Sequence, residues 1–240
     1  MNPTLKLNEA FISIQGEGKT TGTRSLFLRT SGCNMNCKGC DTSHNTINYE
    51  YDSSTIYEIV KDFNVNNIIF TGGEPMLQQR DISSIIDMLF EDSRIYNYEI
   101  ETNGTIKSKY NLYKKIDMWN ISPKMSPMIE EVWKIDYKLL YYVNSMHDYI
   151  VKIPFVVSEE NTLTLNSFII NYGRNIRNKI WLMPYCRDVD EYFKEAQSVW
   201  HFCIENNYNF SSRLQLFHEK FGSDSKIDIK DRGVKIEREI

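Results

Sequence analysis

Apolar residues recur along the chain in two patterns, short buried runs and longer stripes with helical spacing. The short runs predict one strand in the first part of segment 8–18. They predict further strands over 25–30, 67–70, 98–100, 118–121, 149–157 and 180–183. The helical stripes predict helices over 54–63, 79–92, 162–172 and 188–206. Because strands and helices alternate through most of the chain, we expect a mostly parallel sheet with the helices outside it.

The number of strands decides between a closed and an open sheet. About six strands are too few for a closed eight-stranded barrel, so we expect an α/β fold with a partial TIM-type barrel. Pro154 lies inside the predicted strand 149–157 and indicates an edge or a bulge, because proline lacks a backbone N–H. A further strand is predicted over 213–218, and a small hairpin over 227–236.

Composition and charge are those of an ordinary globular protein. Hydrophobic residues make up 41% and charged residues 25% of the 240 residues, and no repeat or linker is visible. We therefore expect a single domain, with a core over 8–221 and a C-terminal extension over 222–240. The net charge of −4 argues against a nucleic-acid partner. No apolar run approaches the ~20 residues of a membrane span and no secretory segment is visible, so we expect a cytoplasmic protein with no membrane partner.

Three of the five cysteines lie close together, Cys33, Cys37 and Cys40, in the spacing C-x3-C-x2-C. Thiolates are soft ligands that favour iron–sulfur clusters, zinc or copper(I). A structural zinc site would need a fourth ligand, such as His44 or Asp41, and would support a binding domain rather than an enzyme. Three cysteines on a four-iron cluster leave one iron open for a non-protein ligand, and the spacing favours this kind of site.

Polar residues cluster where the predicted strands end. They are Arg29, the segment Thr71-Gly72-Gly73-Glu74-Pro75, Glu101 with Asn103, and Ser122 with Lys124. Because ligands lie at the carboxyl ends of the strands in such folds, this clustering indicates an active site. Arg29 is suited to a bidentate contact with a carboxylate, although a solvated arginine at a strand edge would give the same pattern.

Two further segments carry candidate ligand groups. The segment Gln15-Gly16-Glu17-Gly18 predicts a turn whose backbone can approach a ligand closely, and a plain surface turn is the alternative. Asp41 and Thr42 follow the third cysteine and carry oxygen atoms of the kind that Mg²⁺ prefers.

Taken in order, these motifs resemble those of the 7-carboxy-7-deazaguanine synthases, a family of radical S-adenosylmethionine (SAM) enzymes. The resemblance rests on residues 13–18, 27–29, 32–34, Cys37, 40–42, 71–75, 101–104, 122–124 and 213–215 with His218. Two positions depart from the family pattern. Gly39 stands where the family often has an aromatic residue, and Met183-Pro184 stands where a Gln-Pro pair is common.

The resemblance implies cofactors and a site for each. Cys33, Cys37 and Cys40 would hold a 4Fe-4S cluster, and Thr42 would bind Mg²⁺. The residues expected around SAM are Gly39, Asp41, Gly73, Glu74, Ser122, Lys124 and Met183. Those expected around the substrate are Ile14, Gln15, Gly16, Arg29, Thr71, Glu101, Asn103 and His218. No protein residue is expected to be catalytic itself, because the radical is generated on SAM.

The resemblance also implies a reaction. The family converts 6-carboxy-5,6,7,8-tetrahydropterin to 7-carboxy-7-deazaguanine with loss of ammonia, in the biosynthesis of queuosine or of modified DNA bases. It further implies a homodimer and an electron donor such as a flavodoxin. An activating enzyme for glycyl-radical proteins is the alternative, because it shares the cysteine triplet and the Gly-Gly-Glu-Pro segment but acts on a protein partner.

Overall fold

The computed structural model describes residues 3–38, 40, 49–91, 96–125, 135–217 and 227–228. Gly39, Asp41, Thr42 and His218, together with most of the predicted hairpin, lie outside the described residues. Within the described part of the chain, no helix is long and apolar enough to cross a membrane.

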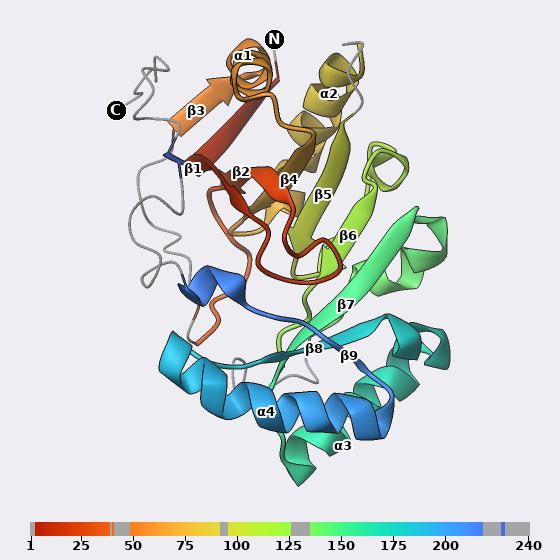
Figure 1. Ribbon diagram of the computed structural model, residues 1–240. Helices are drawn as coiled ribbons and strands as arrows, with labels where there is room; N and C mark the ends of the chain where they lie inside the picture. The colour runs from red at the N-terminus through yellow and green to blue at the C-terminus, as the bar shows by residue number, and fades with distance from the viewer. Residues whose placement is uncertain are drawn as a thin grey trace.

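The described residues form one ten-stranded sheet in the order β10-β1-β2-β4-β5-β6-β7-β8-β9, with β3 paired to β1 (Figure 1). Neighbours from β2 to β9 pair in parallel, whereas β1 is antiparallel to β2, β3 and β10. The strands are β1 Thr4–Ile14, β2 Arg24–Thr30, β3 Tyr49–Asp52, β4 Asn67–Gly72, β5 Asn97–Thr102, β6 Met118–Ile121, β7 Asp148–Phe155, β8 Ile180–Pro184, β9 Asn209–Phe210 and β10 Ile227–Asp228. The expected open, mostly parallel sheet is confirmed.

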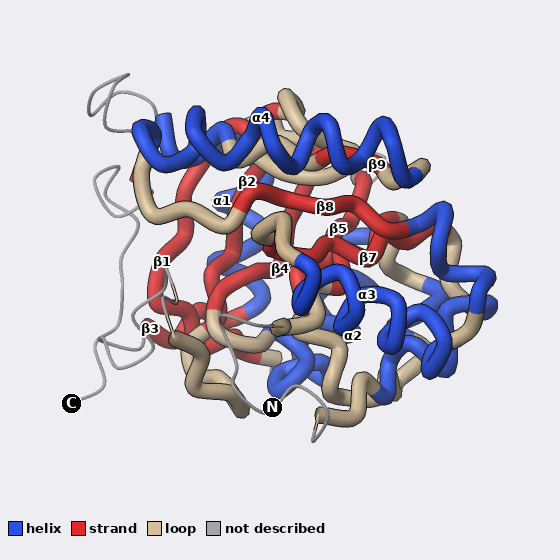
Figure 2. The backbone as a smooth tube through the Cα atoms, turned by 90° about the horizontal axis from the view of Figure 1, so that it is seen from below, coloured by secondary structure: helices blue, strands red, loops and turns tan. Residues whose placement is uncertain are grey.

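Four α-helices follow strands in the described residues and lie outside the curved sheet (Figure 2). They are α1 Ser53–Phe63, α2 Gln79–Phe90, α3 Glu159–Tyr172 and α4 Val189–Asn206. Three begin at a side-chain cap, because Asp52, Ser158 and Asp188 each accept a hydrogen bond from a backbone N–H of the first turn. Short 3-10 helices cover η1 Pro75–Gln78, η2 Leu112–Lys114, η4 Lys138–Ser145, η5 Arg174–Lys179 and η6 Leu214–Phe217.

The two faces of the sheet differ in chemistry. Leu28, Phe70 and Trp119 are fully buried in one apolar cluster that also contains helix residues such as Ile82 and Leu165. Because side chains alternate along a strand, their neighbours point to the opposite face. This opposite side, which we call the inner face, carries Arg29 on β2, Thr71 on β4, Glu99 and Glu101 on β5, Asn120 on β6 and Lys152 on β7.

Of two predictions about local structure, one agrees with the fold and one was wrong. Pro154 lies in β7 beyond Val151, where the pairing with β6 ends, so only β8 flanks the proline and its position is a local edge. Residues 214–217 form the 3-10 helix η6 rather than a strand. The Leu214 N–H donates to the Gly16 carbonyl. This segment is therefore held by the turn that follows β1 and not by a neighbouring strand.

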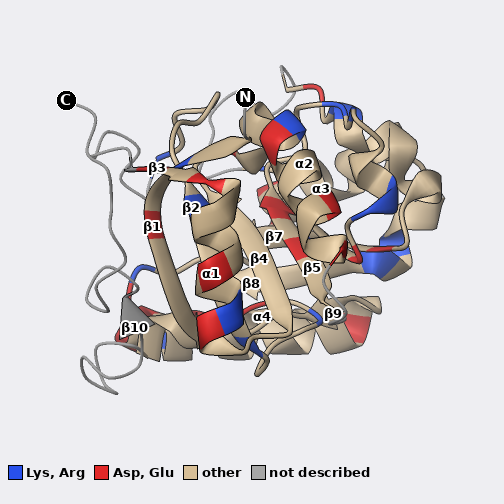
Figure 3. Cartoon of the chain, turned by 90° about the horizontal axis from the view of Figure 1, so that it is seen from above, with Lys and Arg blue, Asp and Glu red and all other residues tan. Residues whose placement is uncertain are grey.

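Charges of both signs are mixed over the elements. Figure 3 marks lysine and arginine beside aspartate and glutamate on the same side of the molecule, for example on α1.

Candidate active site

The cysteine loop, from Cys33 to Cys40, follows the carboxyl end of β2. Cys33 and Cys37 are partly buried and Cys40 is exposed. Burial raises the pKa of Cys33 and of Cys37, and the Lys124 ammonium opposes that rise at both thiols. A negative charge on Cys40 also raises the pKa of Cys33 and of Cys37. Three soft donors beside a cation fit an iron–sulfur cluster with an open iron. Among the described residues, no three such ligands already surround one point.

The Gly-Gly-Glu-Pro loop, residues 72–75 at the end of β4, is joined to the residues directly before the cysteine loop. The Gly73 N–H donates to the Thr30 carbonyl at 3.0 Å, and the Glu74 N–H donates to the Gly32 carbonyl at 2.9 Å. A Cβ on Gly73 would lie 1.9 Å from the Gly32 oxygen, which no side chain allows. The glycine is therefore required for the two loops to touch.

Glu74 connects these loops to the end of β5. It is fully buried, and its carboxylate accepts from the Thr102 hydroxyl and the Asn103 N–H at 2.7 Å each and from the Met76 N–H at 3.0 Å. Burial raises the pKa of Glu74, and these hydrogen bonds oppose the rise. Since all of its described bonds go to protein donors, Glu74 positions the loop.

Asn103 continues the connection back to the cysteine loop. Its side-chain amide donates to the Asn34 side chain at 2.9 Å, and Asn34 donates in turn to the Thr105 hydroxyl at 2.8 Å. Asn34 lies between the first two cysteines of the loop. The loop that follows β5 therefore supports the cysteine loop from a second side.

Lys124 follows β6 and brings positive charge to the thiols. Its ammonium donates to the Ser122 hydroxyl at 2.9 Å, and its carbonyl accepts from the Tyr137 hydroxyl at 2.6 Å. Burial raises the pKa of Tyr137, so this hydroxyl stays protonated and holds the Lys124 backbone. Met183 is buried near the carboxyl end of β8, where it pairs with Pro154 of β7.

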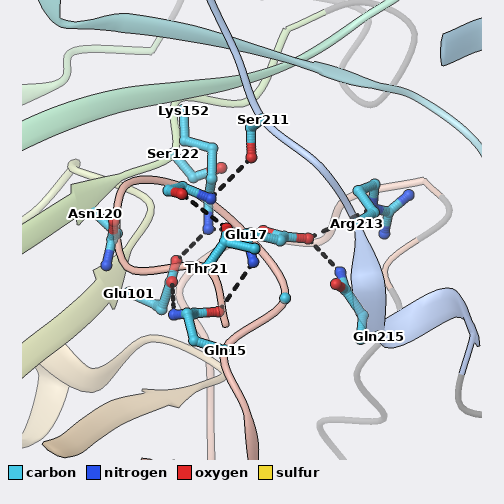
Figure 4. Close-up of polar contacts among 12 residues, drawn as sticks. Gln15, Glu17, Thr21, Glu101, Asn120, Ser122, Lys152, Ser211, Arg213 and Gln215 are labelled. Carbon is cyan, nitrogen blue, oxygen red and sulfur yellow. Dashed lines mark hydrogen bonds and ion pairs between the residues drawn. The ribbon is translucent and has the colours of Figure 1, made fainter. Parts of the chain in front are cut away.

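Lys152 lies on the inner face between two carboxylates (Figure 4). Its Nζ is 2.6 Å from Glu17 Oε2 and 2.6 Å from Glu101 Oε2, and its side chain is 3% exposed. Gln15 donates to the other oxygen of Glu101 at 3.1 Å. Burial alone would lower the pKa of Lys152, but the two carboxylates raise it, so the amine is an ammonium ion.

Glu17 has further partners from the segment that follows β9. Arg213 lies 3.4 Å from Glu17 Oε1, and Gln215 donates to the same oxygen. Burial raises the pKa of Glu17, but the Lys152 and Arg213 cations outweigh it and bring the value to about 2. At Glu101 the balance differs, because burial raises the pKa of that carboxyl above its ordinary value.

The polar turn, residues 15–23, enters the inner face from the end of the sheet opposite to the cysteine loop. It follows β1, and Ile14 pairs with Arg24 at the first residue of β2. The Gly18 N–H donates to the Ser211 hydroxyl at 2.9 Å, and the Thr20 hydroxyl donates to Glu99 at 2.8 Å. The turn therefore closes the amino end of the sheet beneath the inner face.

Two pairs of the expected substrate residues come together. Gln15 contacts Glu101, and Arg29 lies opposite Thr71 on the neighbouring strands β2 and β4. Arg29 Nε also lies 3.0 Å from the Glu9 carboxylate. The Ile14 side chain is 46% exposed. Lys152, Glu17 and Glu99 were not predicted. For Lys152 and Glu99 the signal in the sequence is a charged residue inside an apolar strand, as in Ile150-Val151-Lys152-Ile153, whereas Glu17 lies in the polar turn.

Comparisons with known proteins agree with this arrangement. The family model of the radical SAM superfamily matches residues 27–131. The 7-carboxy-7-deazaguanine synthase of Rhodopirellula baltica is 28% identical over 227 residues, which cover 89% of this chain and 86% of that protein. The enzyme of the same name from Bacteroides thetaiotaomicron is 39% identical over 136 residues, which cover 57% of this chain and 70% of that protein.

A solved structure has the same fold. The crystal structure of QueE from Escherichia coli matches with a TM-score of 0.64 at 20% identity, covering 87% of this chain and 93% of that one. The extent and identity of the sequence matches extend this likeness from fold to family. The chain belongs to the 7-carboxy-7-deazaguanine synthase family of radical SAM enzymes.

Proposed function

We propose that this chain is a radical SAM carbon–nitrogen lyase that converts 6-carboxy-5,6,7,8-tetrahydropterin to 7-carboxy-7-deazaguanine with loss of ammonia. The observation that carries the proposal is the contact of the Gly-Gly-Glu-Pro loop with Gly32, directly before the cysteine loop, next to an inner face rich in hydrogen-bonding groups. A small polar substrate with a carboxylate suits that face.

The cofactor assignments follow the chemistry of the donors. Cys33, Cys37 and Cys40 would hold a 4Fe-4S cluster, with SAM near Gly73, Ser122 and Lys124. When bound, the cluster and SAM supply the radical chemistry, and the protein supplies binding and orientation. Mg²⁺ on Thr42 is part of the proposal.

The inner face offers complementary groups to the two ends of the substrate. Arg29 is a cation at the carboxyl end of β2, and we assign the substrate carboxylate to it. Glu101 presents carboxylate oxygens to the neighbouring N–H groups of the aminopyrimidinone ring. Gln15 carries both a donor and an acceptor and lies 3.1 Å from Glu101.

The polar turn excludes water from the amino end of the inner face. Its backbone is fixed by the Gln15 N–H, which donates to the Thr23 carbonyl at 2.9 Å, and by the Gly18 contact with Ser211. This closure leaves the opposite end, where the cysteine loop lies, as the side on which SAM meets the substrate.

Two partners complete the proposal. A flavodoxin-like protein would deliver the electron, and the active form would be a homodimer. Light scattering on the purified protein tests the dimer, and a mass near that of one chain would remove it.

Turnover under anaerobic conditions tests the reaction. The protein is reconstituted with iron and sulfide and given dithionite, SAM, Mg²⁺ and 6-carboxytetrahydropterin. We expect a product with the mass of 7-carboxy-7-deazaguanine, and its absence in fully reconstituted protein would remove the proposed reaction.

A further inference from the structure

Lys152 is the only lysine or arginine whose side chain the described residues bury between two carboxylates. Its 3% exposed ammonium lies 2.6 Å from Glu17 and 2.6 Å from Glu101, as Figure 4 shows. A cation in this position cannot exchange its partners for water, so it fixes the charge and orientation of both carboxylates.

The two carboxylates depend on Lys152 to different degrees. Glu17 has a second cation, Arg213, and accepts a further hydrogen bond from Gln215. Glu101 has Lys152 as its ion-pair partner in the described part of the chain, and Gln15 as a neutral donor. The other charged groups that face Glu101 are the carboxylates of Glu17 and Glu99, which disfavour its ionisation. Lys152 therefore carries most of the stabilisation of an ionised Glu101.

The protonation state of Glu101 decides which ring edge it fits. An ionised carboxylate accepts at both oxygens, whereas a protonated one donates at one oxygen and accepts at the other. The aminopyrimidinone ring of the proposed substrate presents two N–H donors side by side, one of them from the 2-amino group. A ring without that amino group presents only one donor at this edge.

We propose that Lys152 is a positioning residue that determines specificity for the 2-amino group, by holding Glu101 as a fixed double acceptor. The inference rests on the proposed function, because that proposal assigns Glu101 to the ring of the substrate. Lys152 itself touches Glu101 and Glu17.

Binding of two stable compounds to the reconstituted protein provides the test. The product 7-carboxy-7-deazaguanine keeps the aminopyrimidinone ring, and its 2-deamino analogue differs by that one group. Calorimetric titration gives the affinity ratio of the two compounds. We expect the wild type to prefer the aminated compound roughly 100-fold or more, because the analogue leaves a buried acceptor unpaired.

Lys152→Met removes the cation and keeps the length of the side chain. Near pH 7 we expect its affinity ratio to fall at least tenfold, and to recover as rising pH ionises Glu101. The pH midpoint of binding should lie higher in this variant than in the wild type. Lys152→Arg keeps the charge and should restore most of the ratio. Lys115→Met is the matched control, because Lys115 pairs with Asp87 of α2, outside the sheet, and should leave the ratio unchanged.

The outcomes separate the two proposals. Equal loss of affinity for both compounds in Lys152→Met, with no change in the pH midpoint, would give Lys152 a purely structural part and overturn the inference. If Lys152→Met does not fold, Lys152→Gln serves the same comparison, and a wild-type ratio in it overturns the inference as well. A wild type that forms the product but binds both compounds equally would overturn the inference and leave the proposed reaction intact. A wild type that forms no product would contradict the proposed function itself.

Discussion

Gly73 lies against the carbonyl of Gly32, so close that a Cβ on Gly73 would be 1.9 Å from the Gly32 oxygen. This contact joins the Gly-Gly-Glu-Pro loop to the residue before the first cysteine. We predict that Gly73→Ala displaces the cysteine loop and lowers SAM cleavage roughly 10²-fold, because misplacement by about 1 Å costs that much. Single-turnover assays on the reconstituted variant measure this.

A second glycine supplies the control for that variant. Gly173 ends α3 with a φ of +97°, away from both loops, so Gly173→Ala strains the backbone without touching the site. It should lose stability and keep wild-type SAM cleavage per folded protein. Wild-type cleavage in Gly73→Ala would show that the contact between the loops does not set the site.

Arg29 provides the cation that we assign to the substrate carboxylate. Arg29→Ala should raise KM for the pterin about 10- to 100-fold, the range that corresponds to loss of a charge-assisted hydrogen bond of about 1.5–3 kcal/mol. SAM cleavage without substrate should continue. Arg24→Ala, at the exposed start of the same strand, should leave KM unchanged. An unchanged KM in Arg29→Ala would take Arg29 out of the substrate site.

Glu17 makes stability depend on pH. Its folded pKa of about 2 lies below the ordinary value of 4.5, so its contribution is complete above 4.5 and is lost as pH falls toward 2. Glu17→Gln should lower the free energy of unfolding by about 3–5 kcal/mol near neutral pH, because it leaves Lys152 with one carboxylate fewer. Urea unfolding at a series of pH values should show this difference shrinking in acid.

An exposed glutamate provides the control for that experiment. Glu58 lies on the exposed side of α1, and Glu58→Gln should change the free energy of unfolding little at any pH. If the deficit of Glu17→Gln stays constant from neutral pH to acid, Glu17 is not ionised in the buried ion pair.

Cys37 tests the assignment of the cluster ligands. Cys37→Ala should lose bound iron and SAM cleavage after reconstitution, because two cysteines cannot replace three on one cluster. Cys203→Ala removes a buried thiol from α4 and should keep the iron. Iron and sulfide analysis with activity decides the point, and full iron content in Cys37→Ala would refute the ligand set.

The parts of the fold that the sequence predicted are those with a periodic pattern. The parallel strands β2 and β4 to β8 and all four α-helices follow from apolar runs and helical stripes. The strands β3 and β9 were not predicted, because neither carries an apolar run, whereas β10 lies at the start of the predicted hairpin and pairs with β1. Residues 214–217 alternate like a strand, yet contacts with the polar turn hold them as a 3-10 helix.

The candidate site divides in the same way. The cysteine loop and the Gly-Gly-Glu-Pro loop are local motifs, so the sequence identified both. The ion pairs of Lys152 with Glu17 and Glu101 join three distant segments, and only the fold brings them together. Glu74 was expected around SAM, whereas its described bonds hold the Asn103 backbone and the start of η1.

The most direct test of the central claim is the number of product molecules formed for each SAM consumed by the reconstituted protein with 6-carboxytetrahydropterin. In the proposed reaction SAM acts as a cofactor, so we predict several molecules of 7-carboxy-7-deazaguanine for each SAM lost. SAM cleavage without this product would contradict the account, and would favour an activating enzyme that acts on a protein partner.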